Sequence, residues 1–474
     1  MIKRMAALVG FVALLGTLVW FSPKFALESG SAPTGQSVSV SAADLQLVCP
    51  GGAILSGGTN GTTVGSFTRL GRASVGGYAA GSYSVQSLSA DGSTSVADTT
   101  GPASLGFAAS NSASVQVTSQ QQGSTGLTAT QLQNAANSRL NGLLGASCQA
   151  LSTDLWLVGG DTSTGREALV LLSNPSSVTA TVSLEAFGLG GAKSTSSGIS
   201  VPAHGSQVVP LASILPETKS LAIHLRSFGS AIAAWMQQRT LRGLQYAGAD
   251  WVAPVSEFNK QLSIPGLLIR GSKDGVALKN ANADYFDLVP SLRIFNPSTQ
   301  SVKFTAQIFG ADAKTFGTVI SDTVLPNSAA DFDLAGLADG DYVAFVQADA
   351  PVAAAIRLPR TDKAKTPNTD FAWLPAVSPL SADQLISVPN AGISKLAIAN
   401  PGKTAIDISV GATAVHVAPN STVVLLAPAG GNLKISAGSA AFAATLITDV
   451  NGGVAAMPLV SYQNSSNQLT VLVR

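Results

Sequence analysis

A short phrase occurs three times in this chain and constrains its fold more than any other feature. It reads ALVLLSNPSSVTATVSLEAFG from Ala168, SLRIFNPSTQSVKFTAQIFG from Ser291 and KLAIANPGKTAIDISVG from Lys395. In each copy an apolar run of strand length stops at Asn-Pro, and the residues after it alternate between apolar and polar. Proline has no backbone N–H donor and its φ is fixed. It also disfavours the helical conformation at the Asn before it, so the strand ends in a turn. The repeated unit is therefore a strand, a turn and a half-exposed strand.

Further landmarks follow in the same order within each copy. A Pro and a Ser precede another apolar strand, a hairpin comes next, and two copies close on an Asp, an aromatic residue and a Pro. The copies lie roughly a hundred residues apart, which is the size of one sandwich domain. We expect sandwiches over 152–256, 257–378 and 379–474, with the Asn residues at equivalent turns and the repeated Trp residues mostly buried. The positions concerned are Asn174, Pro175, Asn296, Pro297, Asn400, Pro401, Trp156, Trp251 and Trp373.

A fourth, divergent copy is expected at the front of the chain, over residues 41–151. Cys49-Pro50 stands where the other copies have Asn-Pro, residues 113–131 read as the hairpin, and Cys148 falls near the place of the closing Asp. Residues 132–146 leave a short helix open as an alternative to a strand. The alignment predicts that Cys49 and Cys148 lie close in space.

Composition agrees with an all-β chain and excludes one class of partner. Charged residues make up 11% of the sequence and Gly accounts for 47 residues, and sustained helical periodicity is almost absent. We expect a tandem array of Ig-like β-sandwich domains after one N-terminal transmembrane helix. The net charge is +1 and no basic cluster is interleaved with aromatic residues, so the sequence lacks the electrostatic signature of a nucleic-acid binder.

The first residues have the pattern of an export signal. Lys3 and Arg4 precede an uninterrupted apolar stretch over 5–21 of about one membrane span. No Ala-x-Ala site follows, which favours an uncleaved signal anchor over 1–23 and a flexible tether over 24–40. This predicts a single pass through the cytoplasmic membrane with the C-terminal body outside, or a secreted body if the segment is cleaved.

The two cysteines fit such an exported body. Two cysteines allow one intramolecular pairing, and an oxidising compartment lets that bond form and persist. We therefore expect a Cys49–Cys148 disulfide, with two free thiols as the alternative.

Residues 147–177, read with the leading apolar segment, carry a family resemblance. The chain resembles an uncharacterised family of actinobacterial membrane-anchored extracytoplasmic proteins, the domain of unknown function numbered five-seven-one-nine. One position departs from the family's pattern, because Leu155-Trp156 stands where two aromatic residues are expected. The resemblance implies a place in the cell envelope and no reaction. It rests on Cys49-Pro50, Cys148, Trp156, Gly159-Gly160, Gly165-Arg166 and Asn174-Pro175.

The residues that could carry catalysis form no recognisable constellation. The three histidines, His204, His224 and His416, have no nucleophile motif beside them, and two scattered cysteines give no zinc spacing. The Asp residues near the repeated Trp residues occur once per repeat, so we expect them far apart, as turn caps. Residues 331–341 are rich in Asp but lack the spacing of an EF-hand loop. We expect no catalytic residue, no metal and no cofactor.

The best single candidate for a binding site is the segment GGDTSTGR over 159–166. Its glycines allow close approach of a ligand, and Arg166 could hold a carboxylate or phosphate, so the candidate residues are Gly159, Gly160, Asp161 and Arg166. The alternative is a loop whose Arg pairs inside the fold. For stacking on sugars, Trp235 and a few Tyr residues are the aromatic side chains left outside the repeated signature.

These features predict a non-enzymatic, membrane-anchored scaffold or interaction protein of the cell envelope. Its partners would be an envelope protein or a glycan, and a free sheet edge could accept a partner strand. The alternative is an envelope glycan-binding module or an enzyme whose site lies in an unrecognised loop.

Overall fold

The computed structural model describes residues 34–39, 45–57, 65–71, 73–79, 81–88, 94–100, 103–107, 114–119, 126–311, 317–362, 368–380, 383–460 and 468–473. The expected all-β class is confirmed, since strands dominate the described residues. The apolar segment 5–21 lies outside them. Within the described part of the chain, no helix is both long enough and apolar enough to cross a bilayer.

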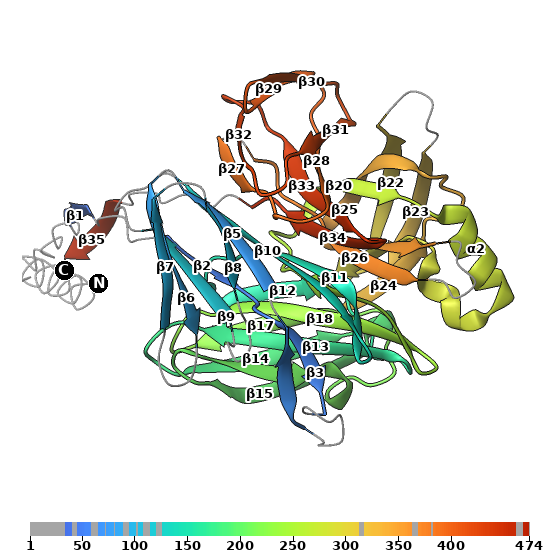
Figure 1. The fold of residues 1–474 in the computed structure, drawn as a ribbon, viewed down its shortest axis with the longest axis horizontal. Coiled ribbons are helices and arrows are strands. Elements are labelled where there is room, and N and C mark those ends of the chain that lie inside the picture. The colour runs from blue at the N-terminus through green and yellow to red at the C-terminus, as the bar shows by residue number, and fades with distance from the viewer. Residues whose placement is uncertain are drawn as a thin grey trace, which may run out of the picture. The chain divides into compact units, whose positions relative to one another are not determined.

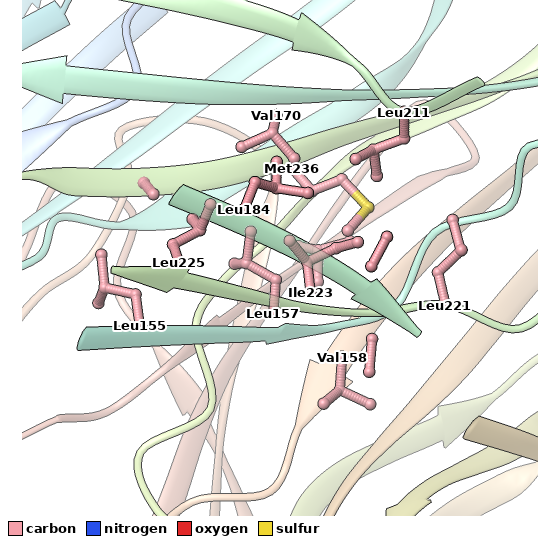
Figure 2. Close-up of a cluster of buried hydrophobic side chains, with 14 of the residues drawn as sticks. Leu155, Leu157, Val158, Val170, Leu184, Leu211, Leu221, Ile223, Leu225 and Met236 are labelled. Atoms are coloured by element: carbon pink, nitrogen blue, oxygen red, sulfur yellow. The ribbon is translucent and has the colours of Figure 1, made fainter. Parts of the chain in front are cut away.

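We number the repeats in chain order: repeat one over 41–151, repeat two over 152–256, repeat three over 257–378 and repeat four over 379–474. Repeat two is an eight-stranded unit of two antiparallel sheets, drawn in green tones in Figure 1. One sheet has the order β12-β17-β14-β15 and the other the order β16-β13-β18-β19. Figure 2 shows side chains from both sheets meeting in one core, among them Leu157 of β12, Val170 of β13 and Met236 of β18. The strand bounds are β12 (Asp154–Val158), β13 (Arg166–Asn174), β14 (Ala180–Phe187), β15 (Lys193–Val201), β16 (Gly205–Pro210), β17 (Ala222–Phe228), β18 (Ala233–Arg242) and β19 (Gln245–Val252).

Repeat three has the same strand order with two changes. Its sixth and seventh strands are fused into the long β25, which pairs with β20 and β22 in its first half and with β21 and β26 in its second. An insert of α2 (Ser272–Ala281) and the 3-10 helix η3 (Ala283–Leu288) follows its first strand. The strand bounds are β20 (Asn259–Ile269), β21 (Ser291–Asn296), β22 (Val302–Gly310), β23 (Thr318–Val324), β24 (Ser328–Asp333), β25 (Gly340–Thr361) and β26 (Thr369–Pro375).

Repeat four keeps the pattern, with sheets β27-β32-β29-β30 and β31-β28-β33-β34. Its two sheets share a core of their own that includes Leu396, Ile408 and Leu446. The bounds are β27 (Gln384–Ser387), β28 (Ile393–Asn400), β29 (Ile406–Val410), β30 (Thr413–Val417), β31 (Ser421–Ala427), β32 (Asn432–Ser436), β33 (Ala443–Val450) and β34 (Gly453–Pro458).

Repeat one also has this order, in sheets β2-β9-β6-β7 and β11-β10-β5-β8, with an inserted hairpin β3-β4. The placement of Cys49-Pro50 at the Asn-Pro position was wrong: Cys49 ends the first strand, whereas each Asn ends the second strand. Residues 132–146 belong to a hairpin rather than a helix. The bounds are β2 (Gln46–Cys49), β3 (Ala53–Ser56), β4 (Phe67–Leu70), β5 (Ala73–Ala79), β6 (Ser82–Leu88), β7 (Thr94–Thr100), β8 (Ala103–Phe107), β9 (Ser114–Ser119), β10 (Leu127–Asn137) and β11 (Leu140–Ser147).

The disulfide between Cys49 and Cys148 is confirmed, with Cα atoms 4.3 Å apart. It joins the end of the first strand of repeat one to the residue after its eighth strand. Both cysteines belong to the core of that repeat, together with Val75, Val85 and Val117.

A separate two-stranded sheet is formed by β1 (Thr34–Ser39) and β35 (Gln468–Val473), which pair antiparallel. These strands belong to a different compact unit from residues 43–464. β1 falls within the stretch 24–40 that was expected to be a flexible tether.

The repeated Asn residues make the same bonds in three repeats. Asn174, Asn296 and Asn400 each end the second strand and are fully buried. The side-chain amide donates to the carbonyl four residues later at 2.8, 2.7 and 2.8 Å, and a second bond reaches the end of the fourth strand. The side-chain oxygen accepts the amide two residues later in every copy. The phrase therefore recurs because one buried amide both shapes the turn and ties it to the neighbouring strand.

The repeated Trp residues are not equally covered. Trp251 and Trp373 are fully buried, whereas Trp156 is half-buried and stacks on His224 with ring centroids 3.9 Å apart. Trp235, considered above as an exposed platform for sugars, is completely buried between repeats one and two. It therefore offers no stacking surface.

The eighth strands of the four repeats meet at one place, which we call the central junction. β11 packs against β19 and β34, and β26 packs against the same two strands, so the contacts return from repeat four to repeat one. The carboxylate of Asp370 in β26 accepts amides from Leu143, Ala249 and Val454, one from each of the other three strands. The four repeats are therefore closed on one another.

Asp250 of β19 lies at the same junction. Its carboxylate accepts the amide of Trp373 at 2.7 Å, and Trp373 belongs to β26, the strand that also carries Asp370. The expectation that these once-per-repeat acids lie far apart was wrong for this pair, because the repeats pack through the strands that carry them. Neither acid caps an exposed turn, since both are buried.

Candidate functional site

The segment 159–166 lies between repeats two and three, where its backbone contacts the neighbouring repeat. A Cβ on Gly159 would lie 3.3 Å from the Trp373 ring, and one on Gly160 would lie 2.2 Å from the sulfur of Met236. Gly160 has a φ of +84° and its carbonyl accepts Arg293 at 2.6 Å. The glycines thus allow close approach, but of side chains of the same chain: Met236 of repeat two, and Trp373 and Arg293 of repeat three.

The two charged residues of the segment have different roles. Arg166 is buried and bonds the carboxylate of Asp287 at 3.0 Å, so it pairs inside the fold. Asp161 accepts the amide and hydroxyl of Ser163 through one oxygen, at 2.7 and 2.6 Å. Asp161 also lines a cavity between the repeats.

Asp287, from η3 of repeat three, is the centre of a buried ion-pair cluster. Arg166 and Arg242 of repeat two and Arg357 of repeat three all contact its carboxylate, and each arginine side chain is at most 7% exposed. Burial alone would raise the pKa of Asp287, but the three guanidinium groups hold that pKa below its ordinary value. One ionised carboxylate therefore joins repeats two and three.

Burial lowers the pKa of two guanidinium groups of this cluster. Desolvation lowers the pKa of Arg242, and it lowers the pKa of Arg357 to about 10 although Asp287 opposes the shift. Two nitrogens of Arg242, Nε and Nη1, are buried and have no hydrogen-bond partner among the described residues. Positive charge is thus in excess here, because three cations share one anion.

A fourth buried arginine, Arg293, also lines the cavity. Arg293 bonds both oxygens of Asp331 at 2.6 and 2.8 Å, and its guanidinium carbon lies 4.8 Å from the centre of the Trp373 ring. The indole nitrogen of Trp373 donates to Gln238 at 2.6 Å. These contacts fix the side chains around the cavity and leave it open.

The cavity has a volume of about 270 Å³ and contains groups of both charges. Asp161, Asp287, Asp331, Arg293, Arg357 and Lys219 all line it. Burial raises the pKa of Asp161. The arrangement is suited to binding a small charged molecule, since polar groups converge on a concave site between two rigid repeats.

Sequence reasoning found part of this site. Of the four residues predicted in the segment 159–166, Asp161 lines the cavity, whereas Gly159, Gly160 and Arg166 do not, and Lys219, Asp287, Arg293 and Arg357 were not predicted. Lys219 lies in another loop of repeat two, Asp287 in the insert of repeat three, and Arg293 and Arg357 in strands β21 and β25. No regular spacing in the sequence relates these positions. A buried arginine in a strand was the available signal, because Arg293 stands inside the apolar run SLRIFN.

The residues considered for catalysis or metal binding do not assemble here. Among the described residues, no group of three or more His, Cys, Asp or Glu side chains could hold a metal ion. His224 is buried between Asp154, at 3.0 Å, and Glu185, at 3.4 Å, rather than at a strand surface. The Asp residues of 331–341 bond separate partners, such as Lys279 for Asp333 and Arg270 for Asp341.

The fold and this site define an all-β protein of four like repeats that close on one another, with a charged cavity between the second and third. Its sequence matches the family described as Family of unknown function (DUF5719) over residues 103–429, and the chain belongs to that family. This confirms the family number that the sequence features suggested. A comparison with curated proteins found no match.

Proposed function

We propose that the protein is a non-enzymatic scaffold on the outer face of the cytoplasmic membrane, anchored by residues 5–21. It would present a fixed four-repeat body to an envelope protein or glycan. The disulfide supports an extracytoplasmic location, because such bonds persist in oxidising compartments.

The central junction carries this proposal. The three amides bonded by Asp370 come from three different repeats, which supports a body that keeps one shape. The buried carboxylates of Asp250 and Asp370 bond backbone amides, and that of Asp287 bonds arginines. An interaction scaffold needs such rigidity, whereas a hydrolase would need an acid facing a substrate.

The free sheet edges offer a way to bind a protein partner. The fourth strand of each repeat lies at a sheet edge, and β15 is the longest of these strands with nine residues. Its sequence KSTSSGISV has no proline and a single charge, so little in it prevents a partner strand from pairing.

One observation favours a glycan as the second candidate partner. An open cavity of about 600 Å³ is lined by Tyr246, Tyr285 and the side-chain amides of Asn141, Gln245 and Asn368. Half-buried aromatic rings beside amides are the groups that stack on and bond to sugars.

The experiment is crosslinking in intact membranes followed by mass spectrometry of the captured molecules. We expect one recurrent envelope protein crosslinked through β15, with protease reaching the body only from outside the membrane. Capture of glycan through Tyr246 would instead support the second candidate. A body accessible only from the cytoplasm would contradict the proposal.

A further inference from the structure

The cavity between repeats two and three has more positive than negative charge around it. Arg293 and Arg357 line the cavity together with the carboxylates of Asp161, Asp287 and Asp331. Two further arginines, Arg166 and Arg242, do not line it but contact Asp287, and each of the four arginine side chains is at most 7% exposed. Asp333 also lines the cavity but is neutralised by Lys279 at 2.8 Å. A buried excess of positive charge is unfavourable unless an anion compensates it.

Lys219 adds a further cation at the edge of the cavity. Its ammonium group lies 4.7 Å from the centre of the Phe286 ring, and within the described chain no carboxylate pairs with it. Asp284 also interacts with Arg242, so with Lys219 included the groups around the cavity carry one positive charge more than negative ones. Cations that line a cavity raise the local concentration of anions.

Gln238 places a side-chain amide at the cavity. Its side-chain oxygen accepts the Trp373 indole at 2.6 Å, which fixes the orientation of the amide. An amide of fixed orientation that lines a cavity is suited to donate to a ligand oxygen through its NH₂ group.

We propose that this cavity is a binding site for a small organic anion that carries a carboxylate or phosphate group. Lys219 and the NH₂ group of Gln238 bind the anionic oxygens, and the arginines behind them supply the positive potential. Trp373 and Phe286 form apolar walls for the rest of the molecule. The ligand thereby adds a bridge between repeats two and three, which goes beyond a scaffold role.

The test is isothermal titration of the purified full-length protein with inorganic phosphate and, separately, with succinate, at constant ionic strength. Lys219→Met is the test variant because Lys219 is exposed and holds no ion pair of the fold. Lys403→Met, at an exposed lysine of repeat four, is the matched control. We expect saturable binding of one of the two ions that is weakened about tenfold by K219M, which equals about 1.4 kcal/mol, and left unchanged by K403M.

The two anions distinguish the chemical class of the ligand. Tighter binding of phosphate would assign a phosphorylated ligand, and tighter binding of succinate a carboxylic acid. No saturable binding of either ion, or equal weakening by K219M and K403M, would overturn the proposal. Thermal unfolding of both variants checks that each is folded.

Discussion

Two buried aspartates join the repeats of this protein and show opposite electrostatics. At the central junction, burial raises the pKa of Asp370 to about 7, although backbone amides oppose the shift. At the joint of repeats two and three, the pKa of Asp287 is lowered despite burial, because three arginines contact it. Asp370 is therefore bonded by neutral backbone amides, whereas Asp287 is bonded by charged guanidinium groups. The charged joint borders a cavity between repeats two and three.

The largest expected effect is at the central junction. Replacing Asp370 with Ala leaves three buried amides without acceptors, each costing about 1–3 kcal/mol, so we expect a loss of roughly 3–9 kcal/mol in the free energy of unfolding. Urea unfolding measures the loss. Asp407→Ala, at an exposed pair with His416, is the control and should change stability by less than about 0.5 kcal/mol. Equal stability of the two variants would refute the role of Asp370.

At the joint between repeats two and three, we expect loss of the Asp287 carboxylate to lower the free energy of unfolding more than loss of the Arg242 guanidinium. Asp287→Asn removes the only carboxylate shared by three buried arginines, and we expect a loss of about 3–5 kcal/mol. Arg242→Met removes one of the excess charges and should cost clearly less. The same urea experiment compares them, and a larger loss for R242M would contradict the excess of positive charge.

The turn amides should have intermediate effects that are similar in three repeats. Asn174→Ala, Asn296→Ala and Asn400→Ala each leave buried carbonyls and an amide without partners, which predicts a loss of about 2–3 kcal/mol. Thermal unfolding by calorimetry measures the three variants. If one of the three substitutions left stability unchanged, the buried Asn would not have the same stabilising role in every repeat.

The smallest expected effect is a pH dependence that separates the two aspartates. Asp370 has a raised pKa, so its stabilising contribution is complete below about pH 4 and is lost as the pH rises towards 7. Between pH 5 and pH 7 this predicts a decrease of about 2 kcal/mol in the free energy of unfolding. Asp250 and Asp161, whose pKa values burial also raises, act in the same direction.

Asp287 has a lowered pKa, so its contribution to stability is present above pH 4 and is lost below it. Stability that rises from pH 5 to pH 7 would contradict the assignment.

The sequence predicted what is local and repeated. The Asn-Pro phrase marked three turns because the residues that form each turn lie within a few positions of one another. Cys49 was assigned to the wrong strand, since the β3-β4 hairpin separates the first strand of repeat one from the second. The disulfide was nevertheless predicted, because two cysteines allow one pairing.

What the sequence did not predict lies between repeats. Asp370 meets residues 121 and 227 positions away, and Asp287 meets an arginine 121 positions away. No periodicity relates such positions, because packing of whole repeats brings them together. The segment 159–166 was found because its glycines are a local sign of close approach, and its partners in repeat three had no local sign beyond the arginine inside SLRIFN.

The closure of repeat four on repeat one is the central claim, and an engineered disulfide tests it directly. A Cβ placed on Gly76 of β5 would lie 2.8 Å from the hydroxyl oxygen of Ser387 in β27, and the carbonyl of Ser387 already accepts the hydroxyl of Thr130 at 2.9 Å. Gly76→Cys with Ser387→Cys should therefore bond, because cysteines at such separations meet the geometry of a disulfide. Peptide mapping of the oxidised double variant should show a bond between 76 and 387 in most molecules, beside the native Cys49–Cys148 bond. The single variant Gly76→Cys controls for folding, and free thiols at both engineered positions in a folded double variant would contradict the closure.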